Sequence, residues 1–320
     1  MRNGICRKRR LLILALILSL VGPYVISRIR SGGRQIRTCI GPEPPAVSAD
    51  FNSSIRVMAY NVAHGRGPID DNWKGTAAEK RNRILEIAKL LGESRADVVV
   101  LNEVDFDSTW SGHQNQAEAI AQAAGFPCRV EHRNLDFRFI YGSLKSGNAI
   151  LSRYPIVDSK LVRYPALHTT ERFLSGHKQG LICTLQISKT QQLRVLAVHL
   201  EHRSEETRVR SAQKIVEAVD ESDIPLIAIG DFNSTLPIWP GAEFDSSGRN
   251  AMDVLHKSKH FAIASESTPA EWNMTYPSIK AGVTIDWILI PKMWKFSNHR
   301  VLDSQLSDHR PVMADLLIAK

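Results

Sequence analysis

Short apolar runs that end in polar side chains recur along this chain, and this pattern constrains its fold more than any other feature. The runs at 58–60, 98–101, 196–198 and 226–229 are each followed closely by an amide, carboxylate or imidazole group. Short apolar runs of this kind are consistent with buried strands, and strand ends gather side chains from distant segments into one rigid site. The polar residues at these ends and near two later runs are Asn61, Asn102, Glu103, His199, Asp231, Asn233, Asp286, Asp308 and His309.

The order of expected elements predicts an α/β (α+β) domain in which helices are interspersed among many strands. Helices are expected at 76–92, 113–124 and 204–219, where apolar residues recur with helical spacing or a capping residue starts the segment. Strands are expected at 55–60, 97–101, 129–132, 147–151, 181–187, 194–200, 226–229, 284–290 and 312–317. Two packed mixed sheets with helices on their outer faces, a four-layer α/β/β/α sandwich, would bury this many strands.

The N-terminal segment has the features of a membrane signal-anchor. Four consecutive basic residues, Arg7 to Arg10, precede a 16-residue apolar run from Leu11 to Ile26. Basic residues followed by an apolar stretch describe a secretory signal, although a spanning helix usually has about 20 apolar residues. We expect an anchor at 1–30, a linker at 31–54 and one large folded domain at 55–320 outside the cytoplasm, with secretion after cleavage as the alternative.

The net charge of +8 does not by itself indicate a nucleic-acid-binding protein. Residues 1–37 contain nine Arg or Lys and no acidic residue, and subtracting these nine from 41 leaves 32 basic against 33 acidic residues. A strong binder of the phosphate backbone usually carries a basic excess on its folded domain. The even balance of basic and acidic residues outside 1–37 weakens the case for a dedicated nuclease.

The four cysteines do not form a recognisable metal motif. None belongs to a C-x-x-C pair, which argues against a zinc ribbon or a thioredoxin-like site. Cys128 and Cys183 could form a disulfide or remain as two buried thiols. Buried thiols are the simpler interpretation, because a free cysteine packs as a small apolar residue.

The polar residues at the strand ends suggest metal chemistry only when they are taken together. Singly, each has a structural explanation, since Asp231-Phe232-Asn233 could form an Asx turn and a lone histidine is usually a satisfied polar residue. As a set, they provide the carboxylate and amide oxygens that a hard cation such as Mg²⁺ binds while keeping several waters. The set predicts metal-assisted hydrolysis of a phosphoester, with Mn²⁺ as a possible substitute for Mg²⁺.

Seven short blocks, in this order, resemble the endonuclease/exonuclease/phosphatase superfamily with its DNase I-like fold. The blocks are Tyr60-Asn61-Val62-Ala63-His64-Gly65, Leu101-Asn102-Glu103-Val104-Asp105, Gly147-Asn148-Ala149-Ile150-Leu151-Ser152, Val198-His199-Leu200, Gly230-Asp231-Phe232-Asn233, Ile285-Asp286-Trp287-Ile288 and Ser307-Asp308-His309-Arg310-Pro311. The resemblance covers about residues 55–318, and it is specific for fold and chemistry but not for substrate. Asn102 stands where the family commonly has glutamine. We interpret this as a change in a residue that supports Glu103 and leaves Glu103 itself in place.

The resemblance implies a role for each metal-side and water-side residue. Glu103 would coordinate Mg²⁺, with Asn61 and Asp308 as direct or water-mediated ligands. Asp231 would orient and deprotonate the attacking water, and Asn233 would position water or phosphate. An alternative mechanism, in which Asp231 binds a second metal ion, remains equally open.

The same resemblance implies that two histidines face the phosphate. His309 would donate a hydrogen bond to a non-bridging oxygen while Asp286 holds its tautomer, because a carboxylate partner favours the charged imidazole. His199 would be a second donor. Attack in line by water would require no covalent intermediate.

Four further residues are weaker candidates for substrate binding, and each has a structural alternative. His64 could instead stabilise a turn, and Asn148 could simply begin a strand. Arg203 precedes a helix and could belong to a solvated face. Tyr276 could stack on a substrate group or pack into the core.

Several functions remain compatible with these residues. The first is a phosphodiesterase acting on lipid headgroups or a related metabolite at the membrane, and the second is an extracytoplasmic endo- or exonuclease. The third is a non-catalytic binding module, and a phosphomonoesterase is also open. The loops at 66–75, 104–116, 165–179 and 234–249 carry no readable substrate code, and nothing in the sequence implies a protein partner.

Overall fold

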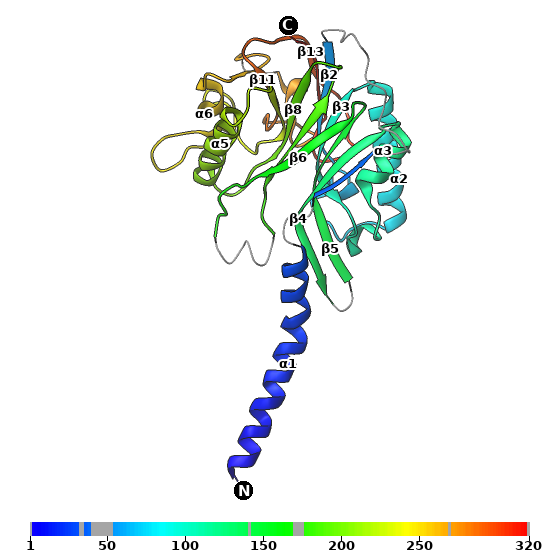
Figure 1. Ribbon diagram of the computed structural model, residues 1–320, viewed down its shortest axis with the longest axis vertical. Coiled ribbons are helices and arrows are strands. Elements are labelled where there is room, and N and C mark those ends of the chain that lie inside the picture. Colours follow the sequence, from blue (N-terminus) through cyan, green and yellow to red (C-terminus); the bar gives the residue numbers. More distant parts are fainter. Residues whose placement is uncertain are drawn as a thin grey trace.

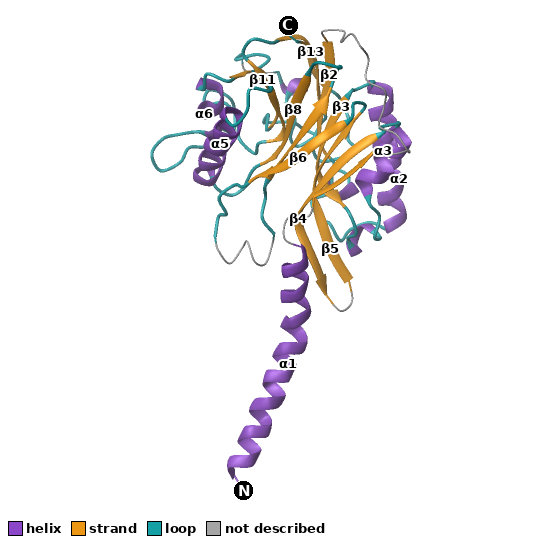
Figure 2. Cartoon of the chain, viewed as in Figure 1, coloured by secondary structure: helices purple, strands orange, loops and turns teal. Residues whose placement is uncertain are grey.

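Two β-sheets pack face to face, and helices cover their outer faces (Figure 1). The computed structural model describes residues 2–31, 35–39, 54–139, 142–168, 176–267 and 270–318. Figure 2 shows the strands gathered in the centre, with helices on both sides. The expected four-layer α/β/β/α sandwich is therefore confirmed.

The first sheet has seven strands in the order β1-β4-β5-β3-β2-β13-β12. β2 and β3 are parallel neighbours in its middle, and the other neighbouring pairs are antiparallel. The strands span Gln35–Cys39 (β1), Ser54–Asn61 (β2), Val98–Asp105 (β3), Cys128–Phe139 (β4), Gly142–Ser152 (β5), Lys295–Val301 (β12) and Val312–Leu317 (β13).

The second sheet has six strands in the order β10-β11-β9-β8-β7-β6. β8 and β9 are its parallel pair. The strands span Ile156–Val162 (β6), Gly180–Gln186 (β7), Gln192–His199 (β8), Leu226–Asp231 (β9), Phe261–Ala262 (β10) and Asp286–Pro291 (β11).

Helices cover the outer face of each sheet, and local sequence signals start them. On the first sheet lie α2 (Ala77–Ser94) and α3 (Gln116–Ala124), and on the second lie α5 (Glu205–Asp220) and α6 (Ala251–Lys257). Thr76 caps α2 with a reciprocal capping box to Glu79, which satisfies two backbone N–H groups that the helix leaves free. Short 3₁₀ turns occupy Ala63–Gly65 (η1), Thr109–Ser111 (η2) and Glu271–Asn273 (η3).

Alternation along the central strands explains why they are apolar on both faces. In β2, Val57 and Ala59 belong to the core between the sheets, whereas Met58 and Tyr60 belong to the core under α2 and α3. Successive side chains of a strand point to opposite faces, so a strand buried on both faces is apolar along its whole length. The polar residue that follows such a strand is therefore the first one free to do chemistry.

The structure overturns the expected membrane anchor. The N-terminal helix α1 spans Arg2–Ser31 and contains Pro23 (Figure 1). Among the described residues, no helix is both long enough and apolar enough to cross a membrane. The apolar run of 16 residues reaches about 24 Å at 1.5 Å per residue, short of the roughly 30 Å hydrocarbon core. The predicted membrane anchor at 1–30, on which the expected placement of the catalytic domain rested, is therefore wrong.

The expected linker at 31–54 also differs from the structure where it is described. Residues Gln35–Cys39 form β1 and pair with β4, so this stretch belongs to the first sheet, while 32–34 and 40–53 lie outside the described residues. The two candidate cysteines differ in chemical state: Cys183 is a buried free thiol and Cys128 is disulfide-bonded. The simpler interpretation of two buried thiols holds for Cys183 only.

Candidate active site

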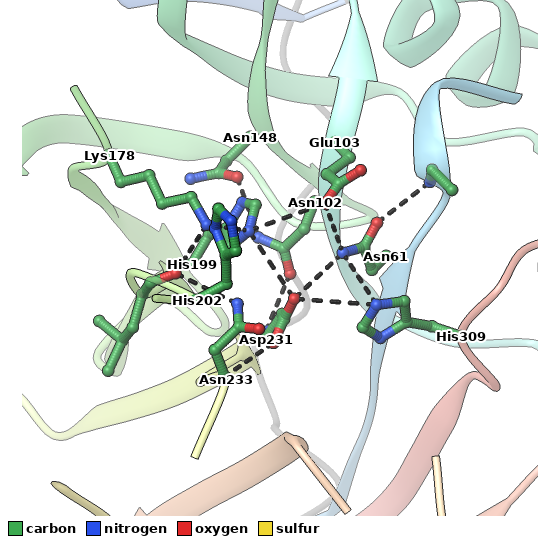
Figure 3. A network of polar contacts seen from close by, with 12 residues as sticks. Asn61, Asn102, Glu103, Asn148, Lys178, His199, His202, Asp231, Asn233 and His309 are labelled. Atoms are coloured by element: carbon green, nitrogen blue, oxygen red, sulfur yellow. Dashed lines mark hydrogen bonds and ion pairs between the residues drawn. The ribbon is translucent and has the colours of Figure 1, made fainter. Parts of the chain in front are cut away.

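Strand ends from both sheets meet and build the site (Figure 3). In the first sheet, Asn61 at the end of β2 is in register with Asn102 of β3. In the second sheet, Asp231 at the end of β9 is in register with His199 of β8 and with Asp286 of β11. β2 lies against β9, and β3 lies against β8. The topology thus brings together polar residues that lie far apart in the sequence.

Three residues of the site, His64, Glu103 and Asn233, have left-handed backbones. Glu103 adopts a left-handed conformation with φ of 53°, where the pairing of β3 with β5 shifts register between Leu101 and Val104. Asn233 is also left-handed, with φ of 49°. This conformation costs a residue with a side chain about 1–2 kcal/mol, and a bulge re-aims the side chain that it carries. Strain of this kind concentrates at functional sites.

Asn61 links carboxylates of the two sheets through its amide nitrogen. Its Nδ2 donates to Glu103 Oε1 at 3.2 Å and to Asp231 Oδ2 at 3.1 Å. Its Oδ1 accepts from the backbone N–H of Ala63 at 3.0 Å, which supports this amide orientation. Direct coordination of a metal by Asn61 would require the amide to turn over and lose the bond to Ala63, so its role as a metal ligand stays a prediction.

The carboxylate of Asp231 is held rigidly and is deeply buried. Its Oδ1 accepts from the backbone N–H of Asn233 at 2.9 Å, and its own backbone N–H donates to Asn102 Oδ1 at 3.1 Å. Burial raises its pKa to about 6, together with the nearby charge of Asp286, although His309 and Lys178 oppose the rise. A carboxylate with this pKa can accept a proton near neutral pH.

His309 and Asp286 form the dyad that the sequence predicts. His309 Nδ1 lies 2.8 Å from Asp286 Oδ2, and its Nε2 lies 4.0 Å from Asp231 Oδ2. Burial favours the neutral imidazole, but Asp286, Asp231 and Asp308 outweigh it and raise the pKa of His309 to about 10. The imidazole therefore carries a positive charge at neutral pH and can donate from both nitrogens.

His199 is neutral and contacts a lysine that the sequence analysis did not single out. Lys178 Nζ donates to His199 Nε2 at 2.8 Å and to the backbone oxygen of Leu200 at 2.8 Å. Burial lowers the pKa of His199 well below its usual value, and the adjacent Lys178 adds to the effect. Figure 3 shows Lys178 and His199 on the opposite side of Asp231 from His309.

A second histidine–aspartate pair lies beside Glu103. His64 Nδ1 lies 2.9 Å from Asp105 Oδ1, and His64 Nε2 lies 3.3 Å from Glu103 Oε2. Asp105 also accepts from Trp110 Nε1 at 2.7 Å. Burial alone would raise the pKa of Glu103, but the nearby charges of His64, Arg66 and His309 lower it far below its usual value. Glu103 is therefore ionised across the physiological range.

Arg66 joins two of the predicted metal ligands. Its guanidinium contacts Glu103 Oε2 at 3.3 Å and Asp308 Oδ2 at closer range. Nε of the same side chain donates to the backbone oxygen of Ile69 at 2.6 Å. The guanidinium thus bridges Glu103 and Asp308, whose role as ligands of one cation stays a prediction.

The donor set fits a divalent cation. Ligand atoms of Glu103, His199 and Asp231 lie within 4.8 Å of one another, as do those of Asp231, Asp286 and His309. A histidine must be neutral to bind a metal, so the charged His309 makes the second trio an ion-pair network. The oxygen atoms of Glu103 and Asp231 are the ligands that suit a hard cation.

The weaker substrate candidates have different surroundings. Asn148 is fully buried and accepts from Asn102 Nδ2 at 2.9 Å, so it positions Asn102 rather than contacting substrate. His64 and Arg203 line a pocket of about 390 Å³ that adjoins Glu103 and His199. Tyr276 lies outside this pocket lining, with its ring 4.8 Å from that of His309.

Three residues of the site were missed by the sequence analysis: Arg66, Asp105 and Lys178. Asp105 ends the block that contains Glu103, and its place two residues beyond that ligand was the available signal. Arg66 and Lys178 lie in segments without a recognisable code. A basic residue just before β7, the neighbour of the β8 strand that carries His199, becomes meaningful only when the pairing is known.

Comparisons with solved structures agree on the fold. A Bacteroides vulgatus endonuclease/exonuclease/phosphatase has TM-score 0.61 and 15% identity, covering 83% of this chain and 99% of that one. A mannosyl-6-phosphatase from Bacteroides thetaiotaomicron has TM-score 0.56 and 16% identity, covering 82% and 100%. ANGEL2, a 2′,3′-cyclic phosphatase in complex with adenosine-2′,3′-vanadate, has TM-score 0.58 and 15% identity, covering 86% and 99%.

The match to a family model extends over most of the chain. No curated protein matches this sequence. The model described as the endonuclease/exonuclease/phosphatase family matches residues 58–309, from the middle of β2 to the histidine of the His309–Asp286 dyad. With the two-sheet sandwich and the acidic site at its strand ends, this match shows that the chain belongs to the endonuclease/exonuclease/phosphatase family.

Proposed function

We propose that this protein is a divalent-metal-dependent phosphodiesterase that cleaves its substrate by in-line attack of water. Members of its family hydrolyse phosphoesters, and the diester preference and the metal are our inference. The observation that carries the proposal is the position of Asn61 between the carboxylates of Glu103 and Asp231, with the charged His309 3.4 Å away. This arrangement supports a metal-binding side and a phosphate-binding side around one point.

The metal side would consist of carboxylates. Glu103 and Asp308 would hold the ion once Arg66 moves aside, and Asp231 lies close enough to share it. We infer Mg²⁺, with Mn²⁺ as a substitute, because hard cations prefer carboxylate oxygens. When bound, the ion supplies charge neutralisation on the phosphate and the leaving oxygen.

The water side would consist of Asp231 and Asn233. Asp231 carries a pKa of about 6, so its carboxylate is mostly ionised near neutral pH and can accept the proton of the attacking water. The Asn233 backbone N–H fixes Asp231 Oδ1, which leaves Oδ2 as the oxygen that faces Asn61. One oxygen is therefore structural, and the other is available for proton transfer.

The phosphate side would consist of His309. Asp286 binds its Nδ1, so Nε2 is the nitrogen that faces the site and donates to a non-bridging oxygen. The charge of the imidazolium opposes the negative charge that grows in the transition state. A preorganised donor of this kind contributes about 10²–10³ in rate.

The size of the neighbouring pocket supports a small organic group on the substrate. The cavity of about 390 Å³ beside Glu103 falls within the roughly 300–1,000 Å³ of small-molecule sites. A nuclease remains the alternative, but the even charge balance of residues 38–320 does not support it. A non-catalytic module would have no reason to keep Glu103, Asp231 and His309 together.

Hydrolysis by the full-length protein tests the proposal. Bis(p-nitrophenyl) phosphate, p-nitrophenyl phosphate and plasmid DNA would be assayed with Mg²⁺ or Mn²⁺ and with chelator. Glu103→Gln should lower diester turnover by at least about 100-fold, because a metal-binding carboxylate becomes a neutral amide. The exposed Glu217→Gln serves as the control. Equal turnover by Glu103→Gln and wild type, or turnover that survives chelation, would refute the metal-dependent mechanism.

A further inference from the structure

The segment that carries Lys178 is anchored on the opposite sheet. The backbone N–H of His177 donates to the backbone oxygen of Asn134 at 2.9 Å, and that of Gln179 donates to Asn134 Oδ1 at 3.1 Å. Gly176 has φ of +90°, and a Cβ there would lie 2.3 Å from the same backbone oxygen. The glycine therefore permits the close approach to β4 that places the lysine at the start of β7.

Among the described residues, the contacts of the Lys178 ammonium leave one of its donors unused. A lysine ammonium has three N–H donors and no acceptor. Two of them are used, by His199 Nε2 and by the backbone oxygen of Leu200. Within the described residues, no carboxylate lies within 4.0 Å of Nζ, and the side chain lines the pocket beside Glu103 and His199.

The contact with Lys178 also determines the state of His199. Because the ammonium can only donate, His199 Nε2 must be the acceptor and carries no proton. This nitrogen lies 3.7 Å from Asp231 Oδ2 and 3.9 Å from Glu103 Oε1, so it faces the centre of the site. His199 cannot donate through Nε2 to a phosphate there, and the available N–H on this side belongs to Lys178.

Asp231 is the carboxylate of the site that has Lys178 as a nearby cation in addition to His309. Four carboxylates, Glu103, Asp231, Asp286 and Asp308, converge on the site, and a phosphoester brings at least one more negative charge. His309 supplies a cation on one side of Asp231, and Figure 3 shows Lys178 on the other. Unpaired charge is costly in a partly buried site. The unused N–H of Lys178 would therefore donate to an anion.

We propose that Lys178 is a catalytic residue that donates a hydrogen bond to a non-bridging oxygen of the substrate phosphoryl group, opposite His309. The proposal rests on the phosphoester hydrolase function proposed above and moves the second phosphate donor from His199 to Lys178. His199 then acts as a positioning residue, because its Nε2 orients the ammonium together with the Leu200 carbonyl.

Two substitutions of Lys178 test this role in the full-length protein. Lys178→Met keeps the length of the side chain and removes the charge and the donors, while Lys178→Arg keeps both. The matched control is Lys160→Met, because Lys160 lies on β6 of the same sheet and pairs with the exposed Glu221. The measurements are kcat and KM on bis(p-nitrophenyl) phosphate, inhibition and binding of inorganic phosphate, the Kd of Mn²⁺ and the unfolding midpoint.

Lys178→Met should lower kcat/KM by about 100-fold, the cost of removing one preorganised donor, and should weaken binding of inorganic phosphate by about tenfold. Lys178→Arg should recover part of both losses. The Kd of Mn²⁺ should not rise, because Lys178 is a cation and does not bind the metal. Lys160→Met should match wild type in every measurement.

The outcomes separate this proposal from the function on which it rests. If Lys178→Met binds inorganic phosphate as tightly as wild type does, the proposal is overturned, whether or not its unfolding midpoint falls. If wild type hydrolyses no phosphoester but Lys178→Met weakens phosphate binding, the proposed function fails while the anion site at Lys178 stands. If wild type binds no phosphate at all, the anion site is refuted as well.

Discussion

At the scale of single residues, the site is a set of charges that compensate each other in pairs. Glu103 faces His64 and Arg66, and Asp231 lies between His309 and Lys178. Carboxylates this close to one another repel, and only nearby cations keep them ionised. The structure achieves this with side chains of the protein itself, which implies that a metal ion has to compete with them.

Arg66 is the side chain with which a metal ion competes most directly. Arg66→Gln should tighten binding of Mn²⁺ by about tenfold or more, because removing a cation that bridges two carboxylates strengthens their pull on another cation. Isothermal titration calorimetry of the full-length protein measures the Kd. Arg81→Gln, on α2 and outside the contacts of Glu103, is the control. Unchanged or weaker Mn²⁺ binding in Arg66→Gln would show that the guanidinium does not occupy the metal position.

At the scale of elements, local signals predicted some segments well and others not at all. Thr76 and Ser204 cap α2 and α5 where the sequence analysis begins those helices. β12, by contrast, was missed because Lys295–Val301 is largely polar and exposed, and its partner β13 alone makes it a strand. The short α6 and the edge strand β6 also lack a clear periodic pattern of apolar residues. Edge elements depend on neighbours that are distant in the sequence.

Gly230 is a position where a strand depends on the absence of a side chain. It sits in β9 with φ of +136°, and a Cβ there would lie 2.2 Å from the backbone oxygen of Val198 and 2.9 Å from Asn102 Oδ1. Gly230→Ala should therefore lower the free energy of unfolding by at least about 2 kcal/mol. It should also reduce kcat, because Asn102 holds the backbone N–H of Asp231.

A second glycine provides the matched control for this substitution. Gly248 also has positive φ, of +76°, but a Cβ there would meet nothing within 4 Å. Gly248→Ala should cost only about 1 kcal/mol from its backbone conformation and leave kcat unchanged. Urea unfolding and diester hydrolysis measure the two effects, and equal costs for both substitutions would show that the close approach of β8 to β9 is unimportant.

At the scale of the whole molecule, stability is coupled to pH through a buried histidine. His132 lies in β4, is 1% exposed, and neither of its ring nitrogens has a hydrogen-bond partner among the described residues. Burial lowers its pKa to about 4, and the nearby His177 adds to the shift. The fold therefore accommodates only the neutral ring, while the unfolded chain is free to bind a proton.

The direction of the pH effect follows from this difference in pKa. Below the unfolded pKa of about 6.5, the unfolded state binds a proton that the folded state refuses until about pH 4. The free energy of unfolding should thus fall as pH drops from about 6.5 to 4, by up to about 3 kcal/mol from this residue.

Urea unfolding at pH 7, 5.5 and 4.5 measures the contribution of His132. His132→Gln should show a shallower loss of stability with acid than wild type, because its side chain does not titrate. His168→Gln, at an exposed position, should keep the wild-type slope. Parallel curves for His132→Gln and wild type would mean that the buried ring does not control the acid response.

The sequence by itself determined which residues are the candidates for the chemistry and where they lie relative to the strands. Apolar runs buried on both faces leave polar residues at the strand end, so Asn61, Glu103 and Asp231 could be named without coordinates, while His309, which precedes β13, was named from its motif. The family resemblance supplied their expected roles, and the His309–Asp286 contact agrees with the predicted dyad. Local composition was enough here because burial imposes a short-range pattern.

Only the tertiary structure decided how these residues face one another and which cations join them. Asn61 meets Asp231 across 170 positions of sequence, and Arg66 meets Asp308 across 242. Lys178 becomes part of the site because β7 pairs with β8, and the apolar N-terminal run proves too short to form the expected membrane anchor. No local pattern encodes such contacts, because they arise from the packing of two sheets whose strands come from distant parts of the chain.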